Sequence, residues 1–182
     1  IVWGSIYCIQ YSKHDPNVDP TEPVRITVEL AERVLQLLPS PPPNIRRPLG
    51  SSSAINWDGN DSTIVRMFSN GDIFLNLNIP EHCSGKMVAS MVGARWYAGA
   101  CNIINEGNET HLRVGSLSIT DDEIEGVSSE VLRNGDASLT TLAAWPQLHP
   151  LNVGDEALHQ ANIPSESGLS RWLTLSNLND DE

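Results

Sequence analysis

The sequence predicts a mainly β protein, an antiparallel β-sandwich or jelly roll with one or two short helices. Short apolar runs recur after residue 60, and Asn70-Gly71 and Asn134-Gly135 are typical of hairpin turns. Strands do not alternate with long amphipathic helices, as they would in a parallel α/β sheet. These three observations favour roughly six to eight short antiparallel strands.

The expected strands are short runs rich in β-branched and aromatic residues, each bounded by Gly, Pro, Asn or Asp. They cover residues 1–11, 63–68, 73–79, 86–97, 111–120, 139–145 and 169–175.

Two segments are candidates for the short helices. Residues 27–38 fit a helix that Thr27 caps and that places Leu30, Val34 and Leu37 on one face, but the alternation in 24–30 fits a strand equally well, so both remain open. Residues 121–132 follow a capping-box pattern that begins at Thr120, with acidic residues in the first turn. The second segment is therefore expected to be helical.

Composition divides the chain into three parts. Residues 39–53 combine a polyproline stretch with a Gly/Ser-rich segment, which is typical of a linker. Residues 1–38 are then the terminal strand or strands of a preceding domain, and residues 54–182 form a β-sandwich domain. The alternative is a long surface loop inside a single domain. Because Ile1 already lies in a strand-like run, we expect the chain to begin partway through a longer polypeptide.

Charge and cysteine content exclude several classes of function. The 11 Lys and Arg residues against 23 Asp and Glu give a net charge of −12, and no basic run could follow a phosphate backbone, so no nucleic-acid partner is expected. No apolar stretch approaches the roughly 20 residues that span a bilayer, so no membrane partner is expected either. The three cysteines are interpreted as small apolar residues rather than as a disulfide or zinc framework; they are Cys8, Cys83 and Cys101.

No nucleophile elbow, phosphate loop, dinucleotide fingerprint or zinc-binding helix is present, so the sequence predicts that the chain is not an enzyme. No cofactor and no catalytic or metal-binding residue is predicted. Calcium alone stays open, because residues 58–61 and 121–123 supply acidic oxygen ligands, although neither has the spacing of a calcium loop. The sequons at Asn60 and Asn108 mark surface loops.

The candidate ligand or interface residues are two tryptophans and two polar neighbours, Trp57, Asp58, Asn60 and Trp96. Trp57 lies in a polar loop with little apolar sequence around it, which favours an aromatic anchor ringed by polar groups. A role in the core is the alternative for Trp57. Trp96 is the second aromatic residue that could stack on a ligand.

The opening residues resemble the end of the shell jelly roll in capsid proteins of small icosahedral positive-strand RNA viruses, the tombus-like and noda-like group. The resemblance rests on residues 4–11, Gly-Ser-Ile-Tyr-Cys-Ile-Gln-Tyr, followed by Asp15-Pro16 and Asp19-Pro20. It implies a hinge, a protruding domain over residues 54–182 and a location in the virion. The apolar element at residues 24–38 departs from the family pattern, which has only a short hinge there.

The resemblance favours a self-assembling, receptor-facing capsid fragment, with a second copy and a host receptor or glycan as partners. The alternative is a cellular β-sandwich that binds carbohydrate or protein. A hydrolase whose carboxylates meet only in three dimensions, as in β-sandwich glycosidases, is the third hypothesis.

Overall fold

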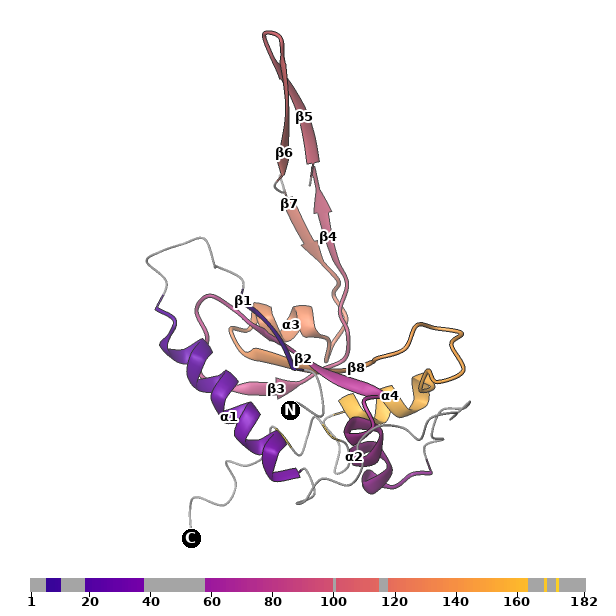
Figure 1. Ribbon diagram of the computed structural model, residues 1–182. Helices are drawn as coiled ribbons and strands as arrows, with labels where there is room; N and C mark the ends of the chain where they lie inside the picture. Colours follow the sequence, from indigo (N-terminus) through magenta and orange to yellow (C-terminus); the bar gives the residue numbers. More distant parts are fainter. Residues whose placement is uncertain are drawn as a thin grey trace.

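The computed structural model describes residues 6–10, 19–37, 58–99, 101–114 and 118–163, together with Leu169 and Leu173. These residues form a four-stranded mixed sheet with helices on both faces, and a long arm of paired strands that projects from this body (Figure 1). The elements are β1 Ile6–Gln10, α1 Thr21–Leu37, α2 Asp61–Ser69, β2 Ile73–Ile79, β3 Met87–Ala89, β4 Arg95–Ala98, β5 Cys101–Glu106, β6 Glu109–Val114, β7 Ser118–Asp121, α3 Ser128–Arg133, β8 Ala137–Ala143 and α4 Asp155–Asn162.

The sheet has the strand order β1-β2-β8-β3 and contains both parallel and antiparallel pairs. β1 runs parallel to β2, β2 runs antiparallel to β8, and β3 runs parallel to β8. The prediction of an antiparallel sandwich or jelly roll was therefore wrong. A single sheet buries its apolar face against helices here, so no second sheet is needed to form the core.

The core lies on one face of β2 and β8. Along β2 the buried side chains alternate with half-buried ones, and the buried positions are Ile73, Leu75, Leu77 and Ile79. The same cluster includes residues of α1, α2 and α4, such as Leu30, Phe68 and Ala161. β1 and α1 therefore belong to the same sheet and core as the elements after residue 60. The predicted linker at residues 39–53 lies outside the described residues.

The opposite face of the sheet is covered by α3, which Figure 1 shows on the other side of the strands from α1 and α2. Below α3, three buried hydroxyl groups form a cluster in which the Ser90 Oγ lies 2.7 Å from the Ser138 Oγ and 3.1 Å from the Thr140 Oγ1. This explains why β8 carries polar residues although Ser138 and Thr140 are almost completely buried.

The segment 27–38, for which the sequence left helix and strand open, is helical as far as Leu37 and belongs to α1. This helix begins at Thr21, six residues before the predicted cap Thr27, because the Asp19 carboxylate accepts a 3.0 Å hydrogen bond from the Thr21 backbone N–H. The Thr27 hydroxyl instead donates to the Pro23 carbonyl oxygen at 2.7 Å. Residues at helical spacing, Ile26, Leu30 and Val34, are buried against the sheet.

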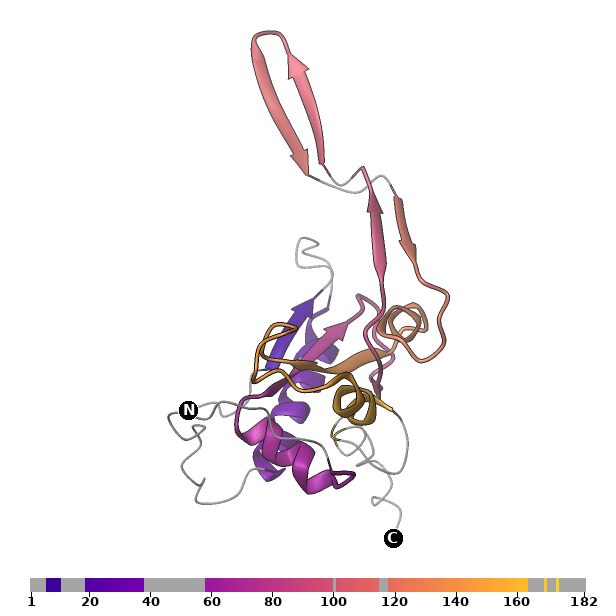
Figure 2. The ribbon, with the colours of Figure 1, turned by 90° about the vertical axis from the view of Figure 1, so that its right-hand side faces the viewer.

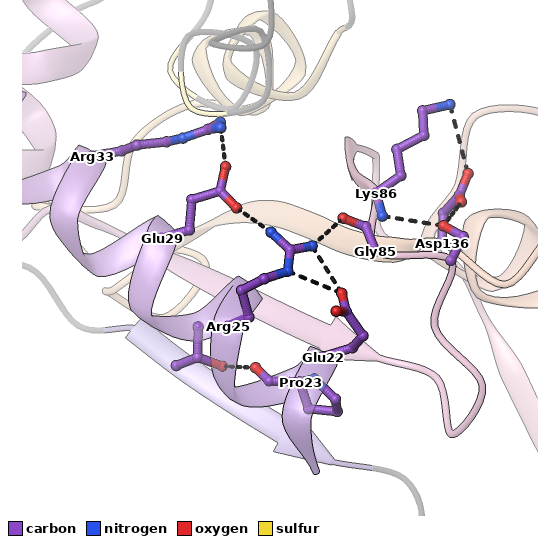
Figure 3. A network of polar contacts seen from close by, with 10 residues as sticks. Glu22, Pro23, Arg25, Glu29, Arg33, Gly85, Lys86 and Asp136 are labelled. Carbon is purple, nitrogen blue, oxygen red and sulfur yellow. Dashed lines mark hydrogen bonds and ion pairs between the residues drawn. The ribbon is translucent and has the colours of Figure 1, made fainter. Parts of the chain in front are cut away.

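A polar network ties α1 to the turn between β2 and β3 (Figure 3). The Arg25 guanidinium bridges Glu22 and Glu29 on its own helix, both at 2.9 Å, and donates to the Gly85 carbonyl oxygen at 2.7 Å. Gly85 has φ +88°, and a Cβ there would lie 3.0 Å from a Glu22 carboxylate oxygen. The turn therefore requires glycine for its backbone conformation, and a larger residue there would also press on the ends of the Glu22 and Arg25 side chains.

α2 replaces the strand predicted at residues 63–68. Ile64, Met67 and Phe68 are buried at spacings of three and one, which one face of a helix provides and one face of a strand does not. Asn70-Gly71 is consequently no hairpin turn: Asn70 caps the C-terminus of α2, and Gly71, with φ +75°, turns the chain into β2.

Most of the other predicted elements exist with different bounds. The strand at 73–79 is β2 with the predicted bounds, and the strand at 139–145 overlaps β8. The segment 86–97 is split into β3 and β4, and 111–120 is split into β6 and β7. The helix expected at 121–132 begins at Ser128, and Asn134-Gly135 ends it instead of forming a hairpin. In the segment 169–175, predicted as a strand, Leu169 and Leu173 are helical and buried.

The arm consists of two successive two-stranded ribbons. β4 pairs antiparallel with β7 next to the body, and β5 pairs antiparallel with β6 beyond it. Figure 2 shows both ribbons extending away from the sheet and its helices. The outer ribbon closes through Gly107-Asn108, where Gly107 has φ +65°. None of the described helices is long and apolar enough to cross a membrane.

Candidate functional site

The outer ribbon of the arm presents an apolar pair to solvent. Ile103 on β5 lies directly opposite Leu112 on β6, so their side chains emerge on the same face. Their exposed fractions are 72% and 65%. Cys101, two residues before Ile103, is a free, exposed cysteine on that face.

The other face of the outer ribbon is mainly polar, although it includes the half-buried Ile104 opposite His111. It carries Asn102, Glu106 and the pair His111 and Glu109, whose Nε2 and Oε2 atoms are 3.3 Å apart. Closer to the body, Trp96 on β4 lies opposite Thr120 on β7 and is 56% exposed. The outer part of the arm therefore presents the exposed pair Ile103 and Leu112 on one face and mostly polar side chains on the other, and its inner part presents an exposed indole.

The arm is fastened to the body by the Asp122 carboxylate, which is almost completely buried. One oxygen accepts a hydrogen bond from the Ala94 backbone N–H at 2.6 Å, and the other accepts one from the Ser129 hydroxyl. The Gly93 backbone N–H donates to the Ser128 Oγ at 3.0 Å. The chain entering the arm is thus bound to the start of α3, the helix that follows the arm.

These hydrogen bonds hold the pKa of Asp122 below its ordinary value of 3.8; the Ser129 hydroxyl is the largest cause and the Ala94 N–H the second. Because the folded-state pKa is lowered, the ionised carboxylate stabilises the fold above the pKa of the unfolded chain. This contribution is lost as the pH falls through the lower folded-state pKa.

We therefore predict that the difference in free energy of unfolding between the wild type and Asp122→Asn is constant above pH about 5 and shrinks as the pH falls below about 3.8. Urea denaturation at a series of pH values measures this difference. The contributions of the other carboxylates to the pH dependence are common to both proteins and cancel in the difference. A difference that is independent of pH from 2 to 7 would contradict the role given to the Asp122 charge.

Of the four predicted site residues, the structure describes Asp58, Asn60 and Trp96. Trp57 lies outside the described residues. Asp58 and Asn60 are exposed at the start of α2, where the Asp58 carboxylate accepts hydrogen bonds from the Thr63 hydroxyl at 2.7 Å and from the Asn60 N–H at 3.1 Å. These bonds, the Thr63 one first, lower the pKa of Asp58. Trp96 lies in β4 on the arm, whereas Asp58 and Asn60 directly precede α2 in the body, so the structure does not bring Trp96 together with them (Figure 1).

The acidic segments considered for calcium have local structural roles. Asp58 orders the first turn of α2, and Asp122 fastens the arm. Over the part of the chain that is described, no three His, Cys, Asp or Glu residues come together in a way that could hold a metal ion. Calcium is therefore not proposed.

The exposed pair Ile103 and Leu112 was not identified from the sequence, although a signal for it exists. Apolar residues two positions apart occur on both sides of Gly107-Asn108, Cys101 and Ile103 before it and Leu112 and Val114 after it, and Gly-Asn is typical of a hairpin turn. The predicted strand at 111–120 covers part of β6, whereas no strand was predicted at 101–106, so the partner of β6 was missing.

Comparisons with known proteins add little to this geometry. No family model matches the chain, and no curated protein matches it. A crystal structure of the SurE protein from Aquifex aeolicus is similar at a TM-score of 0.43 with 17% identity, covering 80% of this chain and 47% of that chain. This chain thus spans about half the length of that SurE protein. A similarity at this TM-score carries no conclusion about fold or activity.

The interpretation as a viral capsid fragment, with its location in the virion, was wrong. Its opening strand, β1, is a parallel strand of a helix-covered mixed sheet, and residues 58–163 contain no β-sandwich within the described part. The alternative of a carbohydrate- or protein-binding sandwich fails for the same reason. The prediction that the chain is not an enzyme was wrong in its grounds as well, because it rested on the absence of short catalytic motifs in an assumed β-sandwich, and the fold is a helix-covered mixed sheet.

Proposed function

We propose that this chain is an oligomerising α/β protein whose projecting arm binds a second copy through the apolar face of β5 and β6. The observation that carries the proposal is the directly opposed pair Ile103 and Leu112, which is largely exposed on a ribbon that extends away from the body (Figure 2). An apolar pair displayed at the end of a protruding element is typical of an interface.

The low stability expected of an isolated two-stranded ribbon favours the presence of a binding partner. A two-stranded hairpin on its own is marginally stable in water, because its strands bury little apolar surface. Packing the Ile103 and Leu112 face against another apolar surface removes both side chains from water, at roughly 25 cal/mol for each Å² of apolar area buried.

Charge favours a second copy as that partner. Residues 95–121 contain two Arg against three Asp and Glu, a net charge of −1, so the remaining chain carries −11 of the total of −12. Two such bodies repel each other, and the arm is the surface at which two copies meet with least repulsion. A two-fold contact joins the same patch on both copies, and an apolar, nearly neutral ribbon face is complementary to itself.

The decisive experiment replaces Ile103 by Lys and measures the molecular mass by sedimentation velocity over a range of protein concentrations. We expect the wild type to form dimers or larger oligomers and Ile103→Lys to associate at least about 30-fold more weakly, since removing an interface hot spot costs about 2 kcal/mol or more. Leu112→Lys is expected to act in the same way.

Leu35→Lys is the matched control. Leu35 is 66% exposed on α1, so the control introduces the same charge at an equally exposed apolar side chain away from the arm. A wild type that stays monomeric at every concentration overturns the proposal, and so does Leu35→Lys dissociating the oligomer while Ile103→Lys leaves it intact. Cross-linking between copies at Cys101 provides an independent readout, with Cys101→Ser as its blank.

A further inference from the structure

A groove of about 520 Å³ lies between the base of the arm, the end of β8 and α4. This volume is in the range that small-molecule sites occupy. Met91 and Val92, which lead into the arm, form one side, Leu142 of β8 contributes to the lining, and Leu158 of α4 forms the other side. The groove is therefore built by three separate segments of the fold.

The walls of the groove are fixed by hydrogen bonds. The side-chain amide of Asn162 on α4 accepts a bond from the Thr141 backbone N–H at 2.6 Å and donates to the Thr141 carbonyl oxygen at 3.0 Å, so it extends the sheet beyond the end of β3. On the other side, the Met91 N–H donates to the Gly126 carbonyl oxygen at 3.0 Å. A pocket held in this way exists before a ligand binds, which lowers the entropic cost of binding.

The lining of the groove is mainly apolar, and its apolar side chains are incompletely covered. Val92 is 62% exposed, and Leu142 and Leu158 are half-buried. An apolar ligand segment of a few carbon atoms would cover all three.

The ionisable side chains that line the groove are all on α4. Asp155 and Glu156 are exposed in its first turn, and His159 follows one turn later. Among the described residues, neither carboxylate forms an ion pair with a cationic side chain. With a chain charge of −12 around them, these carboxylates attract a cation and repel an anion.

We propose that this groove binds a small organic cation, with its apolar part on Val92, Leu142 and Leu158 and its ammonium group held by Asp155 and Glu156. The apolar lining supplies the affinity for the body of the ligand, and the two carboxylates select the sign of its charge. This site does not depend on the association of two copies, since every residue in it comes from a single chain.

The test uses n-hexylammonium, n-hexanol and hexanoate as probes of equal chain length, with binding measured by titration of the amide NMR signals of α4. We expect hexylammonium to bind most tightly, hexanol more weakly and hexanoate not detectably. The double variant Asp155→Asn/Glu156→Gln is expected to weaken hexylammonium at least about tenfold while changing hexanol little. Val92→Ser is expected to weaken hexylammonium and hexanol together.

The matched control is Glu106→Gln/Glu109→Gln, which removes two charges at the end of the arm and should leave hexylammonium binding unchanged. If this control weakens hexylammonium binding as much as Asp155→Asn/Glu156→Gln does, the cation is attracted by the overall negative charge of the protein, and the proposal is overturned. Equal binding of all three probes, or no detectable binding of hexylammonium, overturns it as well. Repeating the titration with Ile103→Lys separates this site from self-association, because binding should persist in that variant.

Discussion

Replacing Phe68 by Ala is expected to lower the free energy of unfolding by about 3–5 kcal/mol, and Met67→Ala by about 2–5 kcal/mol. Both side chains are 1% exposed in the cluster that α2 shares with β2. Removing either one therefore leaves a cavity in a core that cannot collapse freely. Chemical denaturation measured by tryptophan fluorescence gives both values.

The two substitutions together also test the helix. Adjacent residues on a strand point to opposite faces, so a strand at this position would bury Phe68 and expose Met67. Arg66→Ala, whose side chain is exposed on the other side of α2, is the control and should change stability by less than about 0.5 kcal/mol. A small effect of Met67→Ala beside a large effect of Phe68→Ala would contradict the helical assignment.

The residues that could be assigned from sequence are those with a strong local pattern. β2 was predicted with its observed bounds because Ile73, Leu75, Leu77 and Ile79 alternate with residues of the opposite face. Its partner β8 was found within a few residues for a related reason, as β-branched residues and leucine precede Pro146. A strand in the centre of a sheet can thus be recognised from its own residue pattern, whether its neighbours are parallel or antiparallel to it.

α2 shows where a local pattern is too short to decide. Over six residues, the run from Thr63 to Phe68 is compatible with both periods, and Asn70-Gly71 ends a helix as readily as it joins two strands. The glycine supplies the same positive φ in either case. The mistaken hairpin then made the chain look richer in antiparallel strands than it is.

The fold class depended on pairings that no local pattern reports. β1 lies parallel to β2 although Gln10 and Ile73 are separated by α1, α2 and the linker-like residues 39–53. β8 likewise bonds to β2 on one side and to β3 on the other, with the entire arm inserted between β3 and β8 in the sequence. Because residues 1–38 were assigned to a preceding domain, the pairing of β1 with β2, and with it the mixed sheet, was not predicted.

The two proposed sites were beyond sequence reasoning for different reasons. The arm face requires the register that sets Ile103 opposite Leu112, and β5 had not been recognised. The groove requires Val92, Leu142 and Leu158 to meet, and these residues lie on segments that only the completed sheet brings together. Trp57, the strongest candidate from composition, lies outside the described residues.

The second large effect on the free energy of unfolding is expected for a substitution of Gly93, at the base of the arm. A Cβ at this position would overlap the Ser129 hydroxyl oxygen and lie 3.0 Å from the Ser129 backbone nitrogen. Neither neighbour can move freely, because Ser129 is 4% exposed and its hydroxyl is bonded to Asp122. We expect Gly93→Ala to lower the free energy of unfolding by about 1–3 kcal/mol through overpacking.

The neighbouring serine provides a double-mutant cycle for this prediction. Ser129→Ala removes the overlapping hydroxyl group but loses its hydrogen bond to Asp122, so it is destabilising alone, and the double variant Gly93→Ala/Ser129→Ala should cost less than the sum of the two single changes. Gly154→Ala is the control, since a Cβ at Gly154 meets nothing within 4 Å. Strict additivity in urea denaturation would show that Gly93 and Ser129 are not in contact, and the arm would then not be fastened to α3 in the way described.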